Sequence, residues 1–135
     1  MVDASRLMDF LHDEIGDSLR FVVHNHPEKV RVVYSRNDLE DKYDTDELDR
    51  LAEEWSEGKF RKKFIEDIYK YESLDYIVLK FKEALIVTLF PEPEKEEGIA
   101  ISVDSDVDLM PSHFVNECLS QLGKQDGELE EEVGG

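Results

Sequence analysis

The spacing of apolar residues changes along this chain, and these changes constrain its fold more than any other feature. Apolar side chains recur at every third or fourth position, as on one face of an α-helix, in residues 4–19, 45–71 and 110–122. Gly58 breaks the middle stretch into two helical pieces. Short alternating or β-branched runs predict strands at residues 20–26, 30–35, 74–82, 85–90 and 99–103. The predicted order is therefore α-β-β-α-β-β-β-α.

This order predicts an α+β fold with a five-stranded, mainly antiparallel sheet. Leu85 to Phe90 is nearly all apolar, which favours a central strand that is covered on both faces. We expect the two terminal helices on one face of the sheet and the middle helix on the other. Residues 1–123 suit a single domain. Residues 124–135 contain five acids and three glycines, and we expect this acidic tail to be disordered.

The charge of the chain excludes several classes of partner. It holds 34 acidic and 16 basic residues, a net charge of −18. Binding to nucleic acid or to anionic lipid needs a cationic surface, so we expect neither partner. At molar salt the Debye length falls to ~3 Å and screens the repulsion between acids, which favours a halophilic, cytoplasmic protein. Cys118 is the single cysteine, so no internal disulfide forms.

The motifs of the common enzymes are absent or incomplete. Gly16-Asp17-Ser18-Leu19 matches the name of the GDSL esterases, but a helical pattern precedes it instead of a strand. Those esterases also need a late Asp-x-x-His pair to activate the serine, and Met110 stands three residues before His113. The glycines form no phosphate-binding loop. We therefore expect no enzyme activity, no catalytic residues and no cofactor.

The histidines and the cysteine do not form a convincing metal site. His24 and His26 share one face of a strand, and His12 is the only further candidate near them. Such a pair more often lies at a solvated strand end. His113 and Cys118 are five residues apart on a helix, which is a poor spacing for two ligands. Cys118 lies on the apolar stripe, so we expect a buried structural thiol.

Three alternating acids follow the last predicted strand. Asp104, Asp106 and Asp108 have the spacing that begins an EF-hand calcium loop. The loop would need glycine and glutamate where Leu109 and Val115 stand, so the calcium interpretation fails. Asp106 or Asp108 is a candidate N-cap of the last helix, with Pro111 in its first turn.

Aromatic residues gather in the middle helical region. The candidate interface residues are Trp55, Phe60, Phe64 and Ile68, and Tyr69 and Tyr71 follow them. Packing into the core is the simpler explanation for those on the apolar stripe. The density of aromatics exceeds what one buried helix face needs, so a protein interface is the competing hypothesis.

Several stretches resemble a family of small acidic haloarchaeal proteins of unknown function. They are residues 2–20, 33–39, 65–69, 90–91 and 114–119. The resemblance covers most of residues 1–122 and implies no known activity. The element order is also similar to the roadblock and profilin type of fold. Roadblock modules dimerise and bind GTPases, so this similarity implies an interaction role without a specific partner.

Together these observations favour a non-enzymatic interaction or regulatory module of a high-salt cytoplasm, acting as a homodimer with a protein partner. Three alternatives stay open. The terminal Gly134-Gly135 is typical of ubiquitin-like modifiers, although their β-grasp fold begins with a hairpin and this chain begins with a helix. An acidic DNA mimic and a small-molecule sensor are the other two.

Overall fold

The helices and strands follow the predicted order. The computed structural model describes residues 4–26, 29–40, 47, 50, 62–92, 95 and 97–122. The helices are α1 (Ser5–Glu14), α2 (Asn37–Glu40), α4 (Lys62–Tyr69) and α5 (Pro111–Ser120). The strands are β1 (Leu19–His26), β2 (Lys29–Ser35), β3 (Tyr76–Lys80), β4 (Ala84–Leu89) and β5 (Gly98–Asp104). The predicted tail, residues 124–135, lies outside the described residues.

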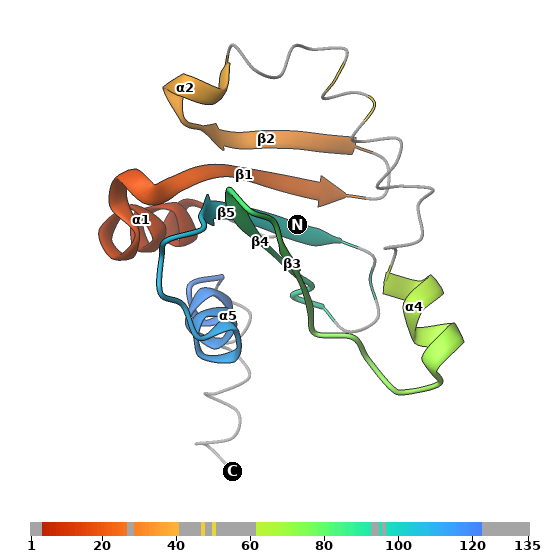
Figure 1. The fold of residues 1–135 in the computed structure, drawn as a ribbon. Helices are drawn as coiled ribbons and strands as arrows, with labels where there is room; N and C mark the ends of the chain where they lie inside the picture. The colour runs from red at the N-terminus through yellow and green to blue at the C-terminus, as the bar shows by residue number, and fades with distance from the viewer. Residues whose placement is uncertain are drawn as a thin grey trace.

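The five strands form one sheet in the order β2-β1-β5-β4-β3, and each neighbouring pair is antiparallel (Figure 1). The predicted α+β class and strand number are therefore confirmed. The expected central strand is wrong, because β4 lies one position from the edge and β5 lies at the centre. Gly98, Ala100 and Ser102 alternate with the apolar residues of β5, so its sequence resembles a strand with one polar face.

The hydrophobic core lies between one face of the sheet and the helices α1 and α5. Ile101 at the middle of β5 pairs with Val22 of β1 on one side and with Val87 of β4 on the other. Leu7 and Leu11 of α1 and buried residues of α5 belong to the same cluster. The fully or almost fully buried members are Leu7, Leu11, Leu19, Val22, Val87, Leu89, Ile99, Ile101, Val103, Phe114, Val115, Cys118 and Leu122. The two terminal helices thus share one face, as predicted.

The first helix ends earlier than its apolar stripe predicts. Gly16 has a φ of 61°, a left-handed conformation that commonly follows the last residue of a helix and that glycine adopts without strain. A 3₁₀ turn, Gly16–Ser18, then leads into β1. Leu19 therefore belongs to the strand, where it is fully buried. The four-residue spacing of Ile15 and Leu19 therefore matches the helical stripe only by coincidence, because Leu19 lies in a strand.

The N-cap of α5 also differs from the prediction, and α1 begins without a side-chain cap. Ala4 precedes α1 and makes no side-chain cap hydrogen bond, while Ser5 is already helical. Met110 occupies the cap position of α5, and Pro111 begins that helix. Asp106 and Asp108 lie too far upstream to cap α5. Within the described ranges, no helix is both long enough and apolar enough to cross a membrane.

Replacing Ile101 tests the central position of β5. Ile101 is fully buried, so Ile101→Ala leaves a cavity in the core and lowers the free energy of unfolding by about 3 kcal/mol. Urea denaturation followed by circular dichroism in about 2 M KCl measures the change. Val32 on the edge strand β2 is 38% exposed, and Val32→Ala changes the same free energy by less than about 0.5 kcal/mol. An equal loss of unfolding free energy in Ile101→Ala and Val32→Ala would contradict the central position of β5.

Candidate interaction surface

Helix α4 turns a polar side inward and an apolar stripe outward. Lys62 is only 3% exposed, whereas Phe64 is 44% exposed and Ile68 is 55% exposed. Phe64 and Ile68 are four residues apart, so both lie on the same side of the helix. A helix that belongs only to a domain core has the opposite arrangement, with its apolar stripe buried. The orientation of α4 therefore leaves an apolar surface without an intramolecular cover among the described residues.

Glu66 makes polar contacts within α4 and with the segment that precedes β3. Lys62 Nζ donates a hydrogen bond to Glu66 Oε2 at 2.5 Å, and the backbone N–H of Leu74 donates to the same oxygen at 2.7 Å. Burial alone would raise the pKa of Glu66, but these two hydrogen bonds outweigh it and hold the pKa below its ordinary value. Glu66 thus links the helix to the connection that leads into β3.

The C-terminal end of α4 has an unusual backbone conformation. The N–H of Lys70 donates to Glu66 O at 2.8 Å, which completes the last helical turn. Lys70 has a φ of 60°, in the left-handed region where glycine is usual and other residues are strained. The chain leaves the helix at this residue and continues through Tyr71, which is 82% exposed.

We define the α4 patch by its exposed apolar and aromatic residues and the two lysines beside them. Tyr69 and Tyr71 are 67% and 82% exposed and follow Phe64 and Ile68 at the C-terminal end of the helix. Lys63 and Lys70 are also exposed. Helix α4, which carries most of the patch, lies on the opposite side of the view from α1 (Figure 1). Large apolar side chains grouped in this way mark interaction sites more often than singly scattered ones do. Its members are Lys63, Phe64, Ile68, Tyr69, Lys70 and Tyr71.

The four predicted interface residues divide into two pairs. The structure places Phe64 and Ile68 together on the outward side of α4. Trp55 and Phe60 lie outside the described residues. Tyr69 and Tyr71 were aromatic neighbours in the sequence without being chosen as interface candidates. The spacing of apolar residues identifies the stripe on a helix but does not say whether that stripe faces the core or the solvent.

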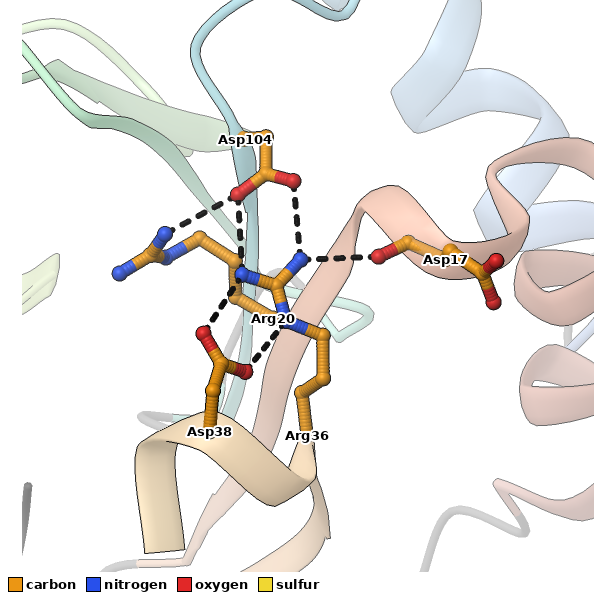
Figure 2. Close-up of polar contacts among 5 residues, drawn as sticks. All are labelled: Asp17, Arg20, Arg36, Asp38 and Asp104. Carbon is orange, nitrogen blue, oxygen red and sulfur yellow. Dashed lines mark hydrogen bonds and ion pairs between the residues drawn. The ribbon is translucent and has the colours of Figure 1, made fainter. Parts of the chain in front are cut away.

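A second group of polar residues, which we call the Arg36 clasp, joins four separate segments (Figure 2). Arg36 Nε and Nη2 donate to the Asp38 carboxylate at 2.6 and 3.1 Å. Nη1 and Nη2 donate to the Asp104 carboxylate at 2.8 and 3.2 Å, and Nη1 also donates to Asp17 O at 2.8 Å. Arg20 Nη1 donates to Asp104 Oδ1 at 3.0 Å. All five N–H groups of Arg36 have an acceptor.

The Arg36 clasp is a structural link. It ties the 3₁₀ turn, β1, the connection from β2 to α2, and the end of β5. Hydrogen bonds from Arg36 lower the pKa of Asp104 despite partial burial, and Arg20 adds to the effect. The Arg36 hydrogen bond likewise lowers the pKa of Asp38. Because its donors are already used, Arg36 has none left for an anionic ligand. Asp104 was predicted only as a loop residue.

The expected solvated position of His24 is wrong. His24 and Glu97 are each 4% exposed, and His24 Nε2 lies 2.5 Å from Glu97 Oε2. Pairing with a carboxylate explains how a histidine can be buried at the edge of the core. Glu97 precedes β5 in an acidic loop, where sequence reasoning did not distinguish it from its neighbours. No three His, Cys, Asp or Glu residues group closely enough to hold a metal in the part of the chain that the structure describes.

Cys118 is buried in the core, as predicted for a structural thiol. Burial raises the pKa of the Cys118 thiol to about 12, and the negative charge of Glu117 adds to the effect. His113 does not approach this thiol as a catalytic partner. Instead, His113 Nε2 lies 2.7 Å from Glu117 Oε1 on the exposed side of α5.

The Asp104→Asn variant tests the Arg36 clasp. The folded pKa of Asp104 lies below its ordinary value of 3.8, so ionised Asp104 stabilises the fold above that pH. This contribution is lost as the pH falls through the folded pKa. Near pH 7, Asp104→Asn lowers the free energy of unfolding by about 2 kcal/mol, and the loss shrinks as the pH falls through the folded pKa of Asp104. Urea denaturation at several pH values measures it, with Asp9→Asn on exposed α1 as the control. A loss independent of pH would contradict the ionic role.

The reactivity of Cys118 follows from its burial. At about pH 8 the thiol is protonated and covered, so a disulfide reagent modifies the folded protein only as fast as the core opens. Modification is therefore slow in native buffer and immediate in urea, as absorbance of the released thiolate reports. The destabilised Ile101→Ala variant reacts faster than the wild type. Immediate reaction of the native protein would show that Cys118 is accessible.

Comparison with known proteins identifies a family. No curated protein matches the chain. The family described as "Domain of unknown function (DUF7522)" matches residues 5–123. The match begins with the first residue of α1 and extends past the end of α5, so it includes every described helix and strand. The chain belongs to the DUF7522 family, a family of domains of unknown function.

Proposed function

We propose that the chain is a non-enzymatic protein-interaction or regulatory module and that the α4 patch is its binding surface. One observation carries the proposal: α4 buries Lys62, which pairs with a partly buried Glu66, while Phe64 and Ile68 are exposed. Exposed apolar side chains in this arrangement contribute little to the stability of the domain itself. A protein partner that covers them supplies the burial that the domain lacks.

The composition of the α4 patch suits protein recognition. Aromatic residues are enriched in the energetically important centres of protein interfaces, and the patch offers Phe64, Tyr69 and Tyr71. Phe64 and Ile68 are each about half exposed, so complete burial of either by a partner adds about 1 kcal/mol of hydrophobic stabilisation. The tyrosine hydroxyl groups can remain at the wet rim of such an interface.

The proposed setting is the salt-rich cytoplasm of a haloarchaeon. A net charge of −18 opposes compaction in dilute buffer, and concentrated salt screens this repulsion. Screening leaves hydrophobic contacts such as those of the α4 patch as the main attraction between proteins. Homodimerisation stays a prediction, as do the DNA mimic and the small-molecule sensor. The modifier hypothesis concerns Gly134 and Gly135, which lie outside the described residues.

Co-purification from the native host tests the proposal. The tagged full chain is isolated at host salt, and retained proteins are identified and quantified by mass spectrometry. We expect a stoichiometric partner that is lost with the Phe64→Gln/Ile68→Gln double variant. Glutamine keeps good helix propensity, so α4 can form without its apolar stripe. Cross-linking between the wild-type chain and the purified partner then places the contact.

Met110→Gln is the matched control, because Met110 is 72% exposed and precedes α5. This variant should retain the partner. Equal retention by the wild type and by the Phe64→Gln/Ile68→Gln variant would contradict the proposal. Equal loss with Met110→Gln would point to a general effect of removing exposed apolar side chains.

A further inference from the structure

The two edges of the sheet differ in how they are protected. The sheet ends at β2 on one side and at β3 on the other, so within the described part of the chain each of these strands has one edge without a neighbour (Figure 1). Proteins commonly protect such an edge with charged residues or with a β-bulge. Strand β2 has both, because it carries exposed Arg31 and its register with β1 shifts between Val22 and Val23. Strand β3 has a regular register with β4 and an uninterrupted apolar and aromatic run at residues 76–79.

The hydrogen bonds at the two ends of β3 show which of its backbone groups bind β4. Phe90 N–H donates to Asp75 O at 3.0 Å, and Phe81 N–H donates to Ala84 O at 2.7 Å. In an antiparallel pair, residues that bond to the neighbouring strand alternate with residues whose N–H and C=O point the other way. The odd-numbered residues from 75 to 81 therefore bond to β4, and the even-numbered residues between them point outward.

The outward residues are Tyr76, Val78 and Lys80, and each offers one N–H donor and one C=O acceptor at the edge of the sheet. The side chains of Tyr76 and Val78 are half-buried beside the core cluster, while Ile77 and Leu79 are half-buried on the opposite face. A row of outward backbone groups between two rows of apolar side chains is the surface that an added β-strand covers. The edge of β3 therefore suits a strand rather than a helix or a small ligand.

We propose that β3 pairs in antiparallel fashion with β3 of a second copy of this chain, about a two-fold axis at Val78. In this register Val78 lies opposite Val78 of the second copy, and Tyr76 of each copy lies opposite Lys80 of the other. Each opposed pair of outward residues exchanges two backbone hydrogen bonds, so every outward N–H and C=O of both strands has a partner. Any other register leaves an outward residue of each strand opposite a residue beyond the end of β3. The two sheets then form one continuous sheet across a symmetric interface.

The side chains of β3 are complementary to those of a second copy in this register. Val78 meets its own copy, and Ile77 meets Leu79 on the opposite face, so apolar side chains oppose apolar side chains. Lys80 meets the ring of Tyr76 rather than another lysine, which is a favourable cation–π arrangement. No like charges are opposed within β3. This self-complementarity favours a second copy over an unrelated strand, which would have to match each of these positions separately.

The charges around β3 also permit the contact. Lys80 Nζ donates to the C=O of Phe81 at 2.7 Å, and among the described residues no carboxylate pairs with it. Just outside the strand, exposed Asp75 falls opposite Phe81 of the second copy, and exposed Lys82 falls opposite Leu74. The net charge of −18 on each copy opposes association in dilute buffer, and concentrated salt screens this repulsion. The dimer should therefore strengthen as the KCl concentration rises.

Sedimentation equilibrium of the full chain at about 0.5 M and about 2 M KCl tests the pairing. The wild type should be a dimer at about 100 µM in the higher salt, with a larger dissociation constant in the lower salt. Val78→Lys and Val78→Glu each place like charges opposite each other at the two-fold axis, so each should weaken the dimer at least about tenfold. An equimolar mixture of the two variants should restore a dimer, because lysine then faces glutamate.

Val32→Lys is the matched control, because Val32 is 38% exposed on the opposite edge strand, and it should leave the dimer unchanged. Phe64→Gln/Ile68→Gln should also leave it unchanged, which separates this contact from the α4 patch. Circular dichroism establishes that each variant is folded.

Amide hydrogen exchange of the wild type tests the same contact without a substitution. The amides of Tyr76, Val78 and Lys80 should become protected as the protein concentration rises, because the second copy accepts their hydrogen bonds. The amides of Ile77 and Leu79 bond to β4 within one copy, so their protection should depend much less on concentration.

Three results would overturn the β3 pairing. The first is a monomeric wild type at about 100 µM in about 2 M KCl. The second is a dimer that Phe64→Gln/Ile68→Gln dissociates while the Val78 variants do not, because a second copy would then occupy the α4 patch. The third is a mixture of folded Val78→Lys and Val78→Glu that stays monomeric. The first and third results leave the proposed function standing, because partner co-purification is tested through Phe64 and Ile68.

Discussion

The packing of β5 between β1 and β4, beneath α1 and α5, is the constraint on which the other features depend. Ile99, Ile101 and Val103 supply the centre of the core. Each end of β5 is also tied to β1 by a polar side-chain contact. Asp104 at one end meets Arg20, and Glu97 just before the other end meets His24. The apolar contacts bring the strands together, and the two polar links sit at the ends of the paired region, where a shift in register would break both.

The acidic residues of this chain have two distinct roles. Most lie on the surface, where salt screens them and any single one contributes little to stability. Glu97, Glu66 and Asp104 instead make short contacts at buried or partly buried positions. Such contacts are screened less, but each carboxylate needs its partner, because an unpaired buried charge is costly. The many surface acids therefore determine how the protein responds to salt. These few paired carboxylates instead contribute to the contacts inside the fold.

Secondary structure and burial are predicted correctly where the spacing of apolar residues matches the environment of those residues in the fold. The strands, the shared face of the terminal helices and the burial of Cys118 follow from apolar spacing. The position of β5 was missed because its small residues resemble a polar face, and the pairing of His24 with Glu97 depends on contacts between residues far apart in the chain. Phe64 and Ile68 were found as a stripe on a helix. Their exposure depends on how α4 packs against the rest of the chain, and local periodicity carries no information on that packing.

The attachment of α4 has a consequence for how the molecule fluctuates. Helix α4 carries exposed apolar side chains and ends at a strained lysine at position 70, so we expect it to open locally at a lower free energy than the core strands do. Its amide protons then exchange with solvent through such openings without unfolding of the sheet. A ligand that binds only the formed helix suppresses them. A bound protein would therefore order α4 more than it orders the core strands.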